Sequence, residues 1–299
     1  MNYNKKAVSI TDQIAKLKAR GLVIHNEIKA DSYLSNISYY RLRAYTYPFQ
    51  DNKDPDHPFT SQISFEEIIN LYVFDRQFRL LVLDAIEKIE ISMRTQVIYH
   101  WAMNNGSHWH LDGNLFRNSV QFAKDYTRLH QEVDRSIETF IDHYKKKYTN
   151  PAEPPCWMSF EVSSFGLLSL IFRNLKLGPE KKAVTKYYGL NDVGVMESWM
   201  HSFSNIRNIC AHHGRLWNRR LTAHIKLPTN TANPFIQNKN VYPYKVYAAL
   251  CCMKYVLDII SPGHSFTKKL VDLMSNCPLA QEKEMGFPAK WNEEKFWQI

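Results

Sequence analysis

The segment Arg207–Arg219, with the sequence RNICAHHGRLWNR, combines residue types that together could cleave a phosphodiester bond. A histidine can accept or release a proton near neutral pH, because the pKa of a free imidazole is about 6.5. An arginine keeps its charge and can hold two phosphate oxygens, which would stabilise the added charge of a pentacoordinate phosphorane. Arg207, Asn208, His212 and His213 are therefore the candidate catalytic residues.

The spacing of these residues limits how they can act together. Arg207 and His212 are five residues apart, which corresponds to about 140° around a regular helix. A shared site requires either a loosened last helical turn or a second copy of the chain that supplies one of the residues. Gly214 favours the loosened turn, since it has the position of a C′ glycine after a helix. His213 is an alternative to His212 as the catalytic histidine.

The positive charge of the chain is concentrated around this motif. Lys and Arg number 38 and Asp and Glu number 29, a net charge of +9, yet no carboxylate occurs from Ser198 to Leu257. Such a surface attracts polyanions. The cations and histidines of the stretch are Arg207, Arg215, Arg219, Arg220, Lys226, Lys239, Lys245, Lys254, His201, His212, His213 and His224. We expect RNA phosphate contacts from Arg215, Arg219, Arg220 and Lys226, with solvated surface charge as the alternative. Trp217 could stack on a base or pack in the core.

The remaining candidate ligands and nucleophiles favour no metal and no cofactor. Cys210 has no orienting acid nearby and is expected to be a core residue. His108 and His110 could hold a metal, but they lack a third ligand nearby. The five cysteines form no CxxC pair, and the first residues lack the apolar stretch of a secretory signal. These features predict a reduced, cytoplasmic protein with no membrane-spanning segment.

The composition predicts an all-α fold, because glycine (10) and proline (13) are scarce and no hairpin signal is present. Helices are expected at 11–20 with Thr11 as the N-cap and Gly21 as the stop, 26–37, 64–105, 119–148, 159–175, 179–188, 193–213, 242–260 and 265–276. Ser64 and Glu67 form a capping box before the third of these, which is one helix or two joined by a kink. The expected segments are a helical extension (1–60), a core (61–262), and a C-terminal helix with an irregular tail (263–299).

Three blocks of the sequence resemble a known family. The stretch Arg207-Asn208-x-x-x-His212 resembles the R-x(4–6)-H signature of the HEPN superfamily, and RNICAHHGRLWNR is similar to its Abi-like proteins of the AbiD/AbiF type. Two further blocks are similar to the same proteins. They are Tyr39–Leu42 with Tyr47–Phe49, and Tyr72–Arg76 with Leu83–Thr95.

This resemblance implies an antiparallel helical bundle that forms a homodimer, in which the two R-x4-H segments face each other. It also implies a metal-independent endoribonuclease that leaves 2′,3′-cyclic phosphate ends and acts as a toxin in abortive infection. His212 would then be the general base or acid, Arg207 would stabilise the phosphorane, and Asn208 would orient His212 or a phosphate oxygen. Some relatives are restrained by a small RNA, which would make RNA both a substrate and an inhibitor.

Two other functions remain open from the sequence. The chain could be a non-catalytic RNA-binding module in which Arg207 and His212 cap the helix end. A helical interaction scaffold is a third option, but it leaves the carboxylate-free stretch unexplained. Glu90 and Arg94 are spaced for an intrahelical ion pair, and a buried polar contact behind the active site is the alternative for them.

Overall fold

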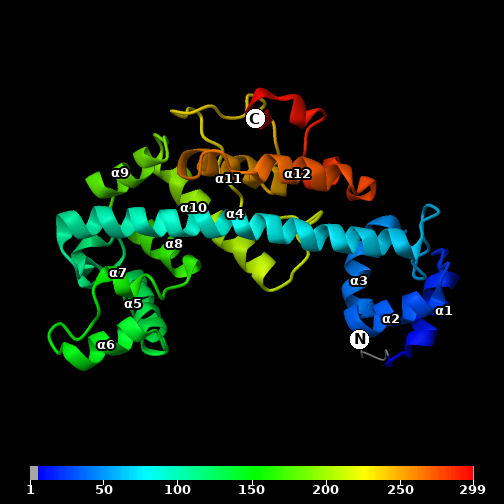
Figure 1. The fold of residues 1–299 in the computed structure, drawn as a ribbon, viewed down its shortest axis with the longest axis horizontal. Helices are drawn as coiled ribbons and strands as arrows, with labels where there is room; N and C mark the ends of the chain where they lie inside the picture. The colour runs from blue at the N-terminus through cyan, green and yellow to red at the C-terminus, as the bar shows by residue number, and fades with distance from the viewer. Residues whose placement is uncertain (1–5, 299) are drawn as a thin grey trace. The chain divides into compact units, whose positions relative to one another are not determined.

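The computed structural model describes residues 6–298, and α-helices are the dominant regular structure in this range (Figure 1). The helices are α1 (Ile10–Ala19), α2 (Glu27–Ile37), α3 (Tyr39–Thr46), α4 (Phe65–Asn105), α5 (Ser119–Asp134), α6 (Thr139–Lys147), α7 (Cys156–Ser159), α8 (Phe165–Asn174), α9 (Pro179–Tyr187), α10 (Val193–Ala211), α11 (Val246–Ile260) and α12 (Phe266–Ser275). Within the described range only isolated β-bridges occur and no strand forms. The all-α prediction is confirmed. No helix of residues 6–298 is both long and apolar enough to cross a membrane.

The chain divides into two compact units. One holds the residues up to Phe78 together with Asp272–Gln281, and the other holds Arg79–Val271 and the residues from Glu282 onward. The division between the two units therefore falls within α4. The first turns of α4 belong to the same unit as α1–α3, since short helices depend on tertiary contacts for their stability. One such contact is the buried hydrogen bond of 2.6 Å that Tyr45 of α3 donates to Asp75 of α4.

The helix ends of the first unit follow local capping rules. Ser9, and not Thr11 as predicted, is the N-cap of α1, and its hydroxyl accepts from the Asp12 N–H at 3.1 Å. Gly21 has a φ of 94° and ends the helix as expected. Asn26 caps α2 through Lys29, and α4 is a single helix that begins at the predicted capping box of Ser64 and Glu67.

In the second unit, α8 packs between α5 and α10, and α11 packs on α10 (Figure 1). Every residue of α11 from Val246 to Leu257 is buried, so the most apolar run of the sequence forms a central helix. The C-terminal tail forms short 3₁₀ turns with a buried aromatic cluster. Trp297 of this cluster donates to the Tyr247 hydroxyl of α11 at 3.1 Å.

Two predicted helices are interrupted. The stretch 119–148 forms α5 and α6, because the backbone leaves the helix at Arg135, and the Ser136 hydroxyl accepts from the Glu138 N–H. The stretch 159–175 forms the short α7 and then α8. Ser164 is the N-cap of α8, and the carboxylate of Glu132 accepts from its N–H at 2.7 Å and its hydroxyl at 3.1 Å. This tertiary contact fixes where α8 begins.

Candidate functional site

Helix α10 positions the motif. Its apolar side buries Trp199, Phe203, Ile206 and Cys210, which confirms the expectation that Cys210 is a core cysteine. Asp192 caps the start of the helix through the Gly194 N–H at 2.7 Å. Because the buried side fixes the rotation of α10, Asn208 and His212 are left exposed and Arg207 is half-exposed.

The end of α10 is a Schellman motif, and the last helical turn is regular. The His213 N–H donates to Cys210 and the Gly214 N–H donates to Ile209, at 3.1 and 2.8 Å. His213, with a φ of 57°, has the left-handed C′ conformation that was predicted for Gly214. The prediction for Gly214 is wrong by one residue. Arg207 and His212 are thus kept at their helical separation, and no hydrogen bond or ion pair links them within residues 6–298.

The reason for a glycine at 214 is a close approach of the backbone. A Cβ at this position would lie 3.2 Å from the Ile209 carbonyl oxygen, whereas a Cβ at Gly166 of α8 would meet nothing within 4 Å. We expect Gly214→Ala to lower the free energy of unfolding by about 1 kcal/mol and the matched Gly166→Ala to raise it by about 0.5 kcal/mol. Urea unfolding of both variants measures this. Equal effects of the two would contradict the steric explanation.

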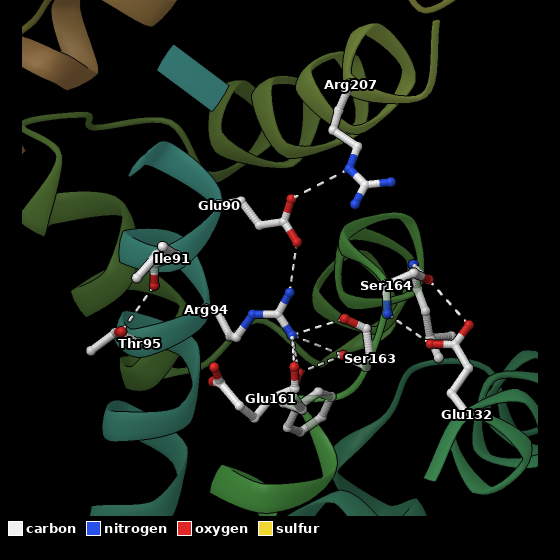
Figure 2. A network of polar contacts seen from close by, with 11 residues as sticks. Glu90, Ile91, Arg94, Thr95, Glu132, Glu161, Ser163, Ser164 and Arg207 are labelled. Carbon is white, nitrogen blue, oxygen red and sulfur yellow. Dashed lines mark hydrogen bonds and ion pairs between the residues drawn. The ribbon is translucent and has the colours of Figure 1, made fainter. Parts of the chain in front are cut away.

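Arg207 is held by a carboxylate from another helix. Its Nε lies 3.8 Å from Oε2 of Glu90 in α4, and the second oxygen of Glu90 accepts from Arg94 at 2.7 Å (Figure 2). Both alternatives for Glu90 and Arg94 are therefore present: they form the intrahelical ion pair, and the pair also reaches the motif. No local sequence pattern predicts the contact between Glu90 and Arg207, because the two residues are distant in the sequence.

Arg94 anchors this contact to the backbone before α8. Its buried guanidinium donates to the carbonyls of Phe160, Glu161 and Ser163 and to the Ser163 hydroxyl (Figure 2). Glu90 is thereby fixed between two arginines, and its charge is shared by Arg207. The contact between Glu90 and Arg207 is a single one of 3.8 Å on a side chain that is 42% exposed, so it biases the orientation of the Arg207 guanidinium without fixing it.

Four of the five predicted RNA contacts are accessible. Arg219, Arg220 and Lys226 are exposed, and Arg215 is half-buried with its guanidinium 5.7 Å from the Trp217 ring. Trp217 itself is only 1% exposed, so its ring packs in the core and has no free face for a base. The packing alternative accounts for this residue.

The histidine pair before α5 is engaged in protein contacts. One ring nitrogen of His108 pairs with Ser107 at 2.9 Å, and the other pairs with the Glu153 carbonyl at 3.0 Å. Burial, followed by the neighbouring His108, lowers the pKa of His110 to about 4. No group of three or more metal-ligating side chains occurs among the described residues.

These features define an all-helical protein with a candidate phosphodiester-binding site at a helix end, inside a segment without carboxylates. The family model for Abi-like proteins matches residues 32–218, more than half of the chain, and includes nearly all of the three sequence blocks. The chain belongs to the Abi-like family, whose membership indicates a role in abortive infection, a defence against phage. No curated protein and no solved structure matches the chain.

Proposed function

We propose that this chain is an endoribonuclease that cleaves RNA during abortive infection, with Arg207 and His212 at its catalytic centre. The observation that carries the proposal is the charge network at the motif: Arg207 lies 3.8 Å from Glu90, which is in turn held by Arg94, at the end of a helix that also exposes His212. An arginine with only a capping role does not require such support.

The reaction we propose is a transesterification. The ribose 2′-oxygen attacks the adjacent phosphorus, and the 5′-oxygen of the next nucleotide leaves. His212 removes the 2′-proton or protonates the leaving oxygen, while Arg207 stabilises the charge on the phosphorane. Asn208 orients His212 or a phosphate oxygen. The products are a 2′,3′-cyclic phosphate and a 5′-hydroxyl, and no metal takes part in this scheme.

A homodimer is part of the proposal, because Arg207 and His212 lie on different sides of α10. A two-fold axis near the helix end would bring Arg207 of one copy and His212 of the other to the same phosphate. In such a dimer one His212 would act as the base and the other as the acid.

The test is cleavage of structured and unstructured RNA by the full chain in EDTA, with identification of the product ends. We expect cyclic-phosphate ends from the wild type and intact RNA with His212→Ala/His213→Asn, in which asparagine tolerates the left-handed backbone of residue 213. Loss of activity on chelation would overturn the metal-independent reaction. Binding without cleavage by both proteins would instead favour the non-catalytic RNA-binding module, in which a bound small RNA is a partner and not a substrate.

Glu90 is expected to act as a positioning residue. In Glu90→Gln the amide keeps a hydrogen-bond acceptor for Arg94 but loses the charge that holds Arg207, so kcat should fall about tenfold with little change in KM. The matched control is Glu87→Gln, an exposed carboxylate on the same helix. Equal kinetics of the two variants would show that Glu90 does not position Arg207.

A further inference from the structure

The segment that follows the motif runs back along α10 as irregular chain with bends at Thr222 and Ala223. Serine hydroxyls of α10 hold one edge of it: Ser202 donates to the Ala223 carbonyl, and Ser198 donates to the His224 carbonyl, each at 3.3 Å. The backbone at 243–244 holds the other edge, since the N–H groups of Leu221 and Ile225 donate to it at 2.8 and 3.1 Å. The segment 220–226 is therefore fixed along both edges.

Side chains alternate strictly along this segment. Leu221, Ala223 and Ile225 are buried, whereas the residues between and beside them are exposed. The burial pattern therefore places the side chains between the buried ones on the solvent-facing side of the segment. The exposed row, called the basic ridge below, consists of Arg220, Thr222, His224 and Lys226.

Aromatic rings lie beside the basic ridge. The centre of the Tyr244 ring is 5.8 Å from that of the His224 ring and 5.5 Å from that of the Tyr242 ring. The Arg220 guanidinium lies 4.1 Å from the centre of the Tyr244 ring. Tyr242 is 59% exposed, so one of its ring faces is open to a ligand. Tyr244 is half-buried, so Tyr242 offers the open ring face, and rings interleaved with cations are typical of surfaces that stack bases and bind phosphates.

A cavity of about 660 Å³ opens next to the same residues. His224, Lys226 and Pro243 contribute to its wall, and its apolar lining includes Val195 of α10. Among the described residues that line it, Asp192 is the one carboxylate, and one of its oxygens already caps α10. The cavity thus combines apolar walls with cations, as a site for a nucleobase requires.

We propose that the basic ridge, together with Tyr242 and Tyr244, binds single-stranded RNA at a surface separate from the cleavage site. The ridge cations contact successive phosphates, the tyrosine rings stack on bases, and the cavity receives one base. A duplex hides the base faces that such a surface uses, so the occupant is a single strand.

The end of the ridge at His224 and Lys226 is remote from His212. Ser198, which holds His224 and Lys226, is fourteen residues before His212 in α10, a distance of about 21 Å along the helix axis. The ridge also lies beyond residue 218, where the family match ends. This surface rests on the proposed function, since it holds the RNA strand whose other part reaches His212.

The test is fluorescence anisotropy of a short labelled single-stranded RNA with the full chain, carrying His212→Ala to prevent cleavage, over a range of salt concentrations. Arg220→Gln/Lys226→Gln should reduce the slope of log K against log salt by about 1.4, or about 0.7 for each lost phosphate contact. Tyr242→Leu should weaken binding about tenfold without a change in slope. The matched controls on α9 are Lys182→Gln/Lys186→Gln and Tyr187→Leu, all at exposed positions, and they should bind as the parent does.

Two results would overturn the proposal that the basic ridge binds single-stranded RNA. One is an equal change of slope in the α9 lysine variant, which indicates diffuse charge. The other is unchanged affinity of Tyr242→Leu, which indicates a surface for any polyanion, including an acidic protein. Cleavage assays without His212→Ala separate the two proposals. If the ridge variants bind RNA as the parent does and the wild type cleaves RNA, only the proposal for the ridge is rejected. If the ridge variants bind RNA differently and the wild type does not cleave it, only the proposal of a nuclease is rejected.

Discussion

His212→Ala is expected to lower the rate of RNA cleavage by about 10²–10⁴-fold while RNA affinity is kept. The imidazole is exposed at the end of α10 and, within residues 6–298, has no hydrogen-bond partner, so its removal disturbs no contact of the fold. The rate loss would therefore report the proton transfer itself. Single-turnover cleavage and RNA binding, measured on the same preparations, separate the two quantities.

The companion variant at His213 must preserve its left-handed backbone. Alanine at a φ of 57° would be strained, and the resulting loss of stability could be mistaken for a catalytic effect. Asparagine tolerates this conformation, so His213→Asn removes the imidazole and keeps the turn. We expect this variant to cleave at a rate near that of the wild type, as should His143→Ala at an exposed position in α6. A large loss in His213→Asn together with an active His212→Ala would assign the catalytic role to His213.

Arg94→Met is expected to lower the free energy of unfolding by about 3–5 kcal/mol, the largest effect on stability foreseen for this chain. The substitution leaves Glu90 beside Arg207 alone and removes the donor for carbonyls at 160, 161 and 163. The effect is large because these groups are buried, so water does not take the place of the hydrogen bonds that the carbonyls lose. Urea unfolding monitored by circular dichroism measures it.

The control for Arg94 is Lys88→Met on the same helix. Lys88 pairs with Asp84 at 3.4 Å, but both side chains are about half-exposed. The free energy of unfolding should therefore change by no more than about 0.5 kcal/mol, as is usual for a surface ion pair. The double variant Glu90→Leu/Arg94→Met should recover part of the stability, because it also removes the unpaired carboxylate. If Arg94→Met proves as stable as Lys88→Met, the network does not support the fold.

Local signals in the sequence were sufficient for much of the architecture. Asn26 and Asp192 cap helices because their side chains reach N–H groups only two or three residues away. A helix was expected at 242–260, and α11 forms within that range. The place of the motif at the end of α10 was likewise readable from the sequence, but the C′ residue was not: whether His213 or Gly214 turns left-handed depends on the close approach to Ile209.

What the sequence by itself determined is the composition of the site: an arginine and two histidines at a helix end, in a stretch without carboxylates. Only the tertiary structure decided which residues support them. Glu90 and Arg207 are far apart in the sequence and meet because the part of α4 from Arg79 onward and α10 belong to one packed unit. The same packing also determines the break between α5 and α6 and the burial of Trp217. It likewise determines the start of α8, where Glu132 of α5 accepts from the N–H of the N-cap Ser164. The alternating residues of the basic ridge form a surface only because α10 and the segment at 243–244 hold the chain on its two sides. Periodicity in the sequence predicts which residues share a face, but it does not predict which partner covers the opposite face.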